Sequence, residues 1–116
     1  MQGRQKLRYA VHVGDADPYA LADDAFLPLE VAYAPGGGDR PPEGAALRVE
    51  GAEVSALRRE GGVLELRVFN ATAAETVVEV DGRQGWLVDL RGRPLEPFDG
   101  SFALRAWAIA TARLTE

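Results

Sequence analysis

The amino-acid sequence predicts an all-β fold, an antiparallel β-sandwich with one short helix near residues 18–25. Many short segments alternate apolar and polar residues with a period of two, which is typical of strands that bury one face. Glycine-containing turn signals recur at short intervals in the C-terminal half, as they do between the strands of a sandwich. These intervals leave no room for the crossover helices of a parallel sheet. We therefore expect a single sandwich domain over residues 1–116.

The N-terminal part is expected to contain a pair of strands with the helix between them. Apolar residues alternate with other residues over 4–13 and over 27–34, and each alternation predicts a strand. Asp17 can cap the helix and Pro18 suits its first position, whereas Pro28 ends it before the second strand. The alternating apolar residues are Leu7, Tyr9 and Val11 in the first strand and Leu29, Val31 and Tyr33 in the second.

A flexible loop is predicted over residues 35–44, which contain four glycines and three prolines. The loop separates the N-terminal strand pair from the C-terminal sandwich strands. It lacks the lysine and the serine or threonine of a phosphate-binding P-loop, so we interpret it as a surface loop or a seam between two subregions.

The C-terminal part carries the most regular strand pattern. The clearest strand is predicted over 62–70, where Leu66 and the apolar residues in phase with it face one way and Glu65 and Arg67 face the other. Phe69 falls on the Glu65 side, which makes it either an edge contact or the cover of a second surface. The full set of strands predicted here is 45–50, 52–59, 62–70, 75–81, 85–90, 101–106 and 108–115.

Turns and core positions follow from the same pattern. Trp86 alternates in phase with Val88, and Phe102 alternates in phase with Leu104, so both aromatic rings are predicted to lie in the core. Trp107 stands at the entrance of the last strand and is the aromatic residue that we expect to reach a surface. The predicted reversals of the chain are Gly61-Gly62, Asp81-Gly82, Arg91-Gly92 and Asp99-Gly100.

Composition excludes several classes of function. The chain has no cysteine and a single histidine, His12, so it has no disulfide, no thiolate nucleophile and no cysteine-type zinc site. Its net charge of −5 repels nucleic acid and anionic membranes, and neither is expected as a partner. No apolar run has the length of a signal peptide or a membrane span, which predicts a cytoplasmic protein.

No catalytic or metal-binding constellation stands out in the sequence. The densest acidic group lacks the alternating ligands and the bend glycine of a calcium loop, so helix capping and solvation explain it better. No pair of carboxylates is singled out for glycosidic chemistry, because most of them lie on the polar side of predicted strands. The acidic group consists of Asp15, Asp17, Asp23 and Asp24.

Several motifs, in order, resemble the C-terminal region of family-38 glycoside hydrolases, the α-mannosidases. Residues 54–59 read Val-Ser-Ala-Leu-Arg-Arg, and after a Gly-Gly turn residues 64–70 read Leu-Glu-Leu-Arg-Val-Phe-Asn. The family has a valine-x-serine-alanine-leucine-lysine strand followed by a leucine-x-leucine-arginine-x-tyrosine-asparagine strand. Residues 7–11, 25–29 and 104–114 are similar to further strands of that region, with Trp107 and Ala108 where the family has a glutamate before isoleucine.

The resemblance implies a C-terminal, immunoglobulin-like β-sandwich of an α-mannosidase-like enzyme. The zinc ion of that family and its aspartate nucleophile belong to a separate domain, so the resemblance implies no catalytic residue, no metal ligand and no cofactor in this chain. The implied partner is the catalytic domain of the parent enzyme. We expect Phe69, Trp107 and Tyr33 to form the interface with that domain or to contact carbohydrate.

Two alternatives remain open at this point. The chain could be a free-standing carbohydrate-binding module with an exposed aromatic platform. It could also be a structural or dimerising sandwich, a homo-oligomer in which edge strands such as 4–13 pair between copies.

Overall fold

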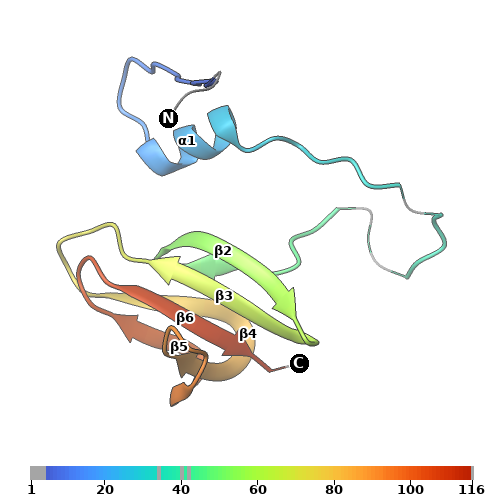
Figure 1. Cartoon of the computed structure of the whole chain (residues 1–116), viewed down its shortest axis with the longest axis vertical. Helices are drawn as coiled ribbons and strands as arrows, with labels where there is room; N and C mark the ends of the chain where they lie inside the picture. Colours follow the sequence, from blue (N-terminus) through green and yellow to red (C-terminus); the bar gives the residue numbers. More distant parts are fainter. Residues whose placement is uncertain (1–4, 34, 40, 42, 116) are drawn as a thin grey trace. The chain divides into compact units, whose positions relative to one another are not determined.

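The computed structural model describes residues 5–33, 35–39, 41 and 43–115, and the chain divides into two compact units, Met1–Arg40 and Pro41–Glu116. The fold is mostly β with one short helix (Figure 1). The boundary between the units lies in the segment 35–44, whose described residues belong to neither a helix nor a strand.

The N-terminal unit contains the predicted helix, α1 (Pro18–Phe26). The Asp17 side chain accepts a hydrogen bond from the backbone N–H of Tyr19 at 3.1 Å, which satisfies one of the free donors of the first turn. Pro18 occupies the first turn, where its missing N–H costs nothing. The helix ends where the N–H of Leu27 bonds to the carbonyl of Asp23 at 2.9 Å. The prediction of a short capped helix is therefore confirmed.

The two strands predicted on either side of this helix are wrong for the residues that the structure describes, 5–13 and 27–33. Positions 4 and 34 lie outside the described residues. An alternating sequence becomes a strand only where a neighbouring strand supplies hydrogen bonds and apolar contact, and no described residue pairs with either segment. The alternating apolar side chains, between 83% and 99% exposed, are Leu7, Tyr9, Val11, Val13, Leu29, Val31 and Tyr33.

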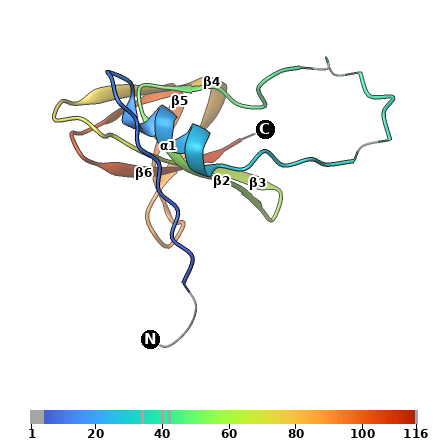
Figure 2. The same ribbon diagram turned by 90° about the horizontal axis from the view of Figure 1, so that it is seen from above.

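The C-terminal unit is a single curled antiparallel sheet with the form of a half-barrel (Figure 1 and Figure 2). Its order is β1-β4-β6-β3-β2, and β5 pairs with β4 beside this path. The strands are β1 (Val49–Glu50), β2 (Glu53–Glu60), β3 (Val63–Phe69), β4 (Thr76–Val88), β5 (Pro94–Leu104) and β6 (Ile109–Leu114).

Two of the four predicted reversals are bends inside long strands. Asp81-Gly82 lies within β4 and Asp99-Gly100 within β5, so the two strands predicted at 75–81 and 85–90 are one continuous strand. Gly82 and Gly100 have φ values of 59° and 72°. A β-bulge uses the same positive φ as a tight turn, and the pairing of β4 with β5 is interrupted between Glu79 and Gln84. These bends help to curl the sheet.

The core lies on the inner, concave face of the curled sheet. Phe98 and Phe102 meet there edge to face with ring centroids 5.2 Å apart, so the predicted burial of Phe102 is confirmed. Trp86 is not in the core and is 45% exposed, because it is Leu87 that points inward from β4. The buried cluster consists of Leu66, Val68, Val78, Val80, Leu87, Phe98, Phe102, Leu104, Ala112 and Leu114.

Candidate functional site

The outer face of the sheet is the surface opposite the core, on strands β2, β3, β6 and β4. Residues that lie directly across from each other in an antiparallel pair project to the same side. Glu65 lies across from Arg113 on one side and from Arg58 on the other, and Trp86 lies across from Arg113. The outer face therefore carries Arg58, Glu65, Arg67, Phe69, Trp86, Val88, Ile109, Thr111 and Arg113.

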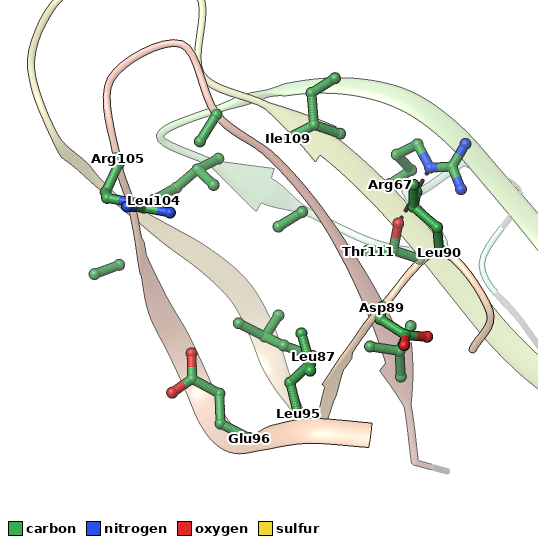
Figure 3. A pocket seen from close by; sticks show the side chains of 14 residues that line it. Arg67, Leu87, Asp89, Leu90, Leu95, Glu96, Leu104, Arg105, Ile109 and Thr111 are labelled. Carbon is green, nitrogen blue, oxygen red and sulfur yellow. Dashed lines mark hydrogen bonds between the residues drawn. The ribbon is translucent and has the colours of Figure 1, made fainter. Parts of the chain in front are cut away.

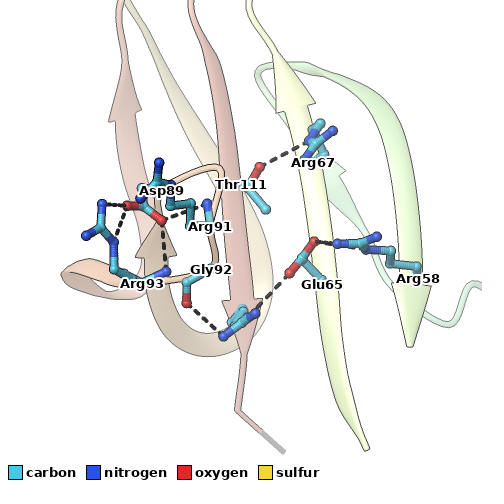
Figure 4. Close-up of polar contacts among 9 residues, drawn as sticks. Arg58, Glu65, Arg67, Asp89, Arg91, Gly92, Arg93 and Thr111 are labelled. Atoms are coloured by element: carbon cyan, nitrogen blue, oxygen red, sulfur yellow. Dashed lines mark hydrogen bonds and ion pairs between the residues drawn. The ribbon is translucent and has the colours of Figure 1, made fainter. Parts of the chain in front are cut away.

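Glu65 is a buried carboxylate bridged by two arginines (Figure 4). Arg58 donates to Oε1 from Nη2 at 2.6 Å and from Nε at 2.9 Å, while Arg113 donates to Oε2 from Nε at 3.3 Å. Nη1 of Arg113 also donates to the carbonyl of Gly92 at 2.8 Å. The bridge ties β2, β3, β6 and the turn after β4 together.

The electrostatics of the bridge keep Glu65 ionised. Burial by itself raises the pKa of this carboxyl, because a charge is less stable away from water. The hydrogen bonds and positive charges of Arg58 and Arg113 outweigh burial, and the pKa of Glu65 is lowered below 4.5. At neutral pH the site therefore contains an ionised carboxylate between two guanidinium groups.

A second carboxylate organises the turn between β4 and β5. Asp89 accepts hydrogen bonds from the backbone N–H groups of Arg91 and Arg93 at 2.8 and 2.9 Å, and from Nε of Arg93 at 2.7 Å (Figure 4). The backbone hydrogen bond from Arg93 is the main cause that lowers the pKa of Asp89. The turn holds Arg91 and Gly92 next to the outer face.

The sheet and this turn enclose a hollow of about 230 Å³, which we call the polar pocket. Arg67 lies in its wall and donates from Nε to Oγ1 of Thr111 at 3.1 Å. The full lining of the polar pocket is Arg58, Glu65, Arg67, Asp89, Leu90, Arg91, Gly92, Thr111 and Arg113.

A larger hollow of about 650 Å³, the apolar pocket, lies next to the polar pocket (Figure 3). Leu90, Leu95 and Ile109 line it and are 90%, 66% and 69% exposed. The two pockets share Arg67, Asp89, Leu90 and Thr111. An apolar surface and a charged one therefore adjoin on the same part of the molecule.

The three residues predicted from the sequence as interface or carbohydrate contacts lie in different settings. Phe69 is half-buried on the outer face, directly across from Ile109, which makes it part of a second surface. Trp107 is 67% exposed in the turn between β5 and β6. Tyr33 is 96% exposed and belongs to the N-terminal unit.

Trp107 is held in an unusual backbone conformation. Its φ of 57° lies in the left-handed region, which bulky side chains rarely adopt, and no other described non-glycine residue has a positive φ. Its backbone N–H bonds to the carbonyl of Thr72 at 3.2 Å, and the N–H of Ala108 bonds to Arg105 at 3.1 Å. The turn therefore presents an exposed indole at a cost in backbone strain, which points to a role at a surface.

Asn70, which the sequence analysis did not single out, fixes the position of this turn. The side chain is buried, and its Nδ2 donates towards the carbonyls of Ala74, Leu104 and Arg105 at 2.7, 3.2 and 3.1 Å. Its Oδ1 accepts from the backbone N–H and the hydroxyl of Thr72, each at 2.9 Å. An asparagine at the end of a strand is too common for the sequence to signal this role.

Comparisons with known proteins leave the family open. No family model matches the chain, and no curated protein or solved structure matches it either. Among the residues that the structure describes, no group of three or more histidine, aspartate or glutamate side chains could hold a metal ion. The described helical residues form no segment with the length and apolarity of a membrane span.

Proposed function

We propose that this chain is a non-catalytic β-sandwich domain of an α-mannosidase-like glycoside hydrolase and that it supports the catalytic domain. The observation that carries the proposal is the set of alternating apolar side chains over 5–13 and 27–33, all nearly fully exposed. The choice of family rests on the resemblance of the motifs at 54–59 and 64–70 to two strands of the α-mannosidases.

The exposed alternating residues favour a partner that contains a sheet. Burying one valine, leucine or aromatic side chain stabilises a protein by about 1.5–3 kcal/mol. Seven such side chains are exposed at alternate positions of the two segments, so this chain does not gain the stabilisation that burying them would provide. A neighbouring domain that pairs with the two segments as strands would bury these side chains and would also form hydrogen bonds with their backbone N–H and C=O groups.

The outer face supports the same proposal. On the outer face Phe69 is half-buried and Ile109 is exposed, and a second sheet packed on these two residues would complete a sandwich. Trp107 adds an exposed, strained aromatic residue of the kind that forms the centre of an interface. In this proposal the immunoglobulin-like sandwich is formed with the catalytic domain, which also supplies the zinc ion and the nucleophile.

An activity assay on the isolated chain tests the non-catalytic role. With zinc or cobalt added, aryl mannosides should be hydrolysed no faster than in the buffer alone. Hydrolysis above the buffer rate would contradict the proposal if an affinity resin that removes the protein from the solution also removes the activity.

A free-standing carbohydrate-binding module is the second candidate, and the position of Trp86 favours it. The indole is 45% exposed and lies across from Arg113, so an aromatic ring and a hydrogen-bond donor adjoin on one surface. Titration with mannosides at millimolar concentration should change the tryptophan emission if this candidate is correct. An unchanged spectrum would remove it.

A further inference from the structure

We propose that the polar pocket binds a small oxyanion, free or carried by a sugar as a phosphate or carboxylate group. Arg58, Arg67, Arg91 and Arg113 line the pocket, and only Glu65 and Asp89 oppose their charge there. The lining is therefore cationic in a chain whose net charge is −5. The inference is independent of the proposed enzyme domain.

Both carboxylates already have their partners within the protein. Glu65 is held by Arg58 and Arg113, and Asp89 is held mainly by Arg93, whose guanidinium is outside the lining. Ion pairs within the protein thus balance the charges of Glu65 and Asp89. The positive charges of Arg67 and Arg91 have no such partner among the described residues and face the pocket.

Arg67 and Arg91 also keep unused donors. Nε of Arg67 donates a hydrogen bond to Oγ1 of Thr111. Its two terminal nitrogens take part in no hydrogen bond within the described part of the chain. The guanidinium of Arg91 makes none with any described residue. A guanidinium presents its donors in a planar fork that matches the oxygens of a carboxylate or phosphate, which makes these two groups suitable ligands.

The size of the pocket limits the ligand. A volume of about 230 Å³ is several times the share of about 30 Å³ that one water molecule takes in the liquid, so it admits an oxyanion with some water. A neighbouring hollow of about 220 Å³ is lined by Trp86 and Pro94 and shares Gly92 and Arg113 with the polar pocket. A sugar ring attached to the anion could extend over the indole there.

Isothermal titration of the full chain with inorganic phosphate in low-salt buffer tests the proposal. We expect saturable binding with one site, weakened at least tenfold when Arg67→Gln and Arg91→Gln are combined, since each removes a charge-assisted contact. The matched control is Arg48→Gln, which removes the same charge from an exposed position beside β1 and should change the affinity less than twofold. Unchanged far-ultraviolet circular dichroism shows that the variants fold.

Parallel titrations with glucose 6-phosphate and with glucose distinguish the sources of the anion. Tighter binding of the sugar phosphate than of phosphate indicates a sugar-borne ligand, and equal binding indicates a free oxyanion. The proposal is overturned if phosphate does not saturate a site, if glucose binds as well as its phosphate, or if Arg48→Gln weakens phosphate binding as much as the pocket variants do.

Discussion

Replacing Asn70 by alanine should destabilise the sheet and release the turn that carries Trp107. Asn70 directly follows β3. Its Nδ2 donates to carbonyls at the end of β5 and in the 70–75 segment, and its Oδ1 accepts from that same segment. Its backbone N–H also bonds to the carbonyl of Ala108 at 2.9 Å, and this bond survives the substitution. The effect therefore measures the side chain alone.

The expected loss follows from the hydrogen bonds of the amide. The two hydrogens on Nδ2 are shared among three carbonyls, and Oδ1 accepts two bonds, so about four bonds are lost at about 0.5–1.5 kcal/mol each. The carbonyl of buried Leu104 is left without this donor, whereas groups nearer the surface can bond to water. We expect the free energy of unfolding to fall by about 2–4 kcal/mol.

Urea unfolding followed by tryptophan fluorescence and circular dichroism measures this loss. Ser55→Ala is the control, because its exposed hydroxyl makes one long bond of 3.4 Å, and its removal should cost less than about 0.5 kcal/mol. Amide exchange at Trp107 should accelerate in the Asn70 variant. A loss below about 1 kcal/mol, or a loss equal to that of the control, would refute the assigned role of Asn70.

Variants of Glu65, Trp107 and Gly85 test other features of the same sheet. Folding lowers the pKa of Glu65, so the ionised carboxylate stabilises the protein fully above pH 4.5, and this stabilisation is lost as the pH falls through the folded pKa. In urea unfolding, Glu65→Gln should therefore be less stable than the wild type at neutral pH, and this difference should narrow in acid and not widen. Trp107→Gly relieves the left-handed backbone strain and should change the free energy of unfolding by less than about 1 kcal/mol. Removing a tryptophan from a protein core costs about 3–5 kcal/mol, so a loss in that range would mean that Trp107 is packed. Gly85→Ala brings a Cβ into overlap with the carbonyl oxygen of Arg113, so thermal melts should show that the protein is destabilised by about 2 kcal/mol or more. A neutral effect would contradict the close approach of β4 and β6.

Local signals predicted the helix and the hairpin best. Asp17 and Pro18 define the start of the helix within a few residues of chain. The two-residue turn at Gly61-Gly62 sets the register of β2 and β3, so that Arg58 falls opposite Glu65, and this ion pair could have been predicted from the sequence.

Contacts between distant parts of the chain could not be predicted in this way. Arg113 reaches Glu65 only because β6 pairs with β3, and no local rule selects that neighbour. Trp86 was misassigned to the core because the phase of an alternation does not say which face is buried, and here Leu87 is the inward residue. The segments 5–13 and 27–33 have the sequence pattern of strands but no described neighbour with which to pair.

Immunodepletion tests the central claim most directly. Antibodies raised against the C-terminal unit, residues 41–116, are used to remove this polypeptide from an extract of the cells that make it, and zinc-dependent α-mannosidase activity is measured before and after. If the chain is a supporting domain of such an enzyme, the activity should leave the extract in proportion to the antigen. Full removal of the antigen with the mannosidase activity unchanged would contradict the proposed function.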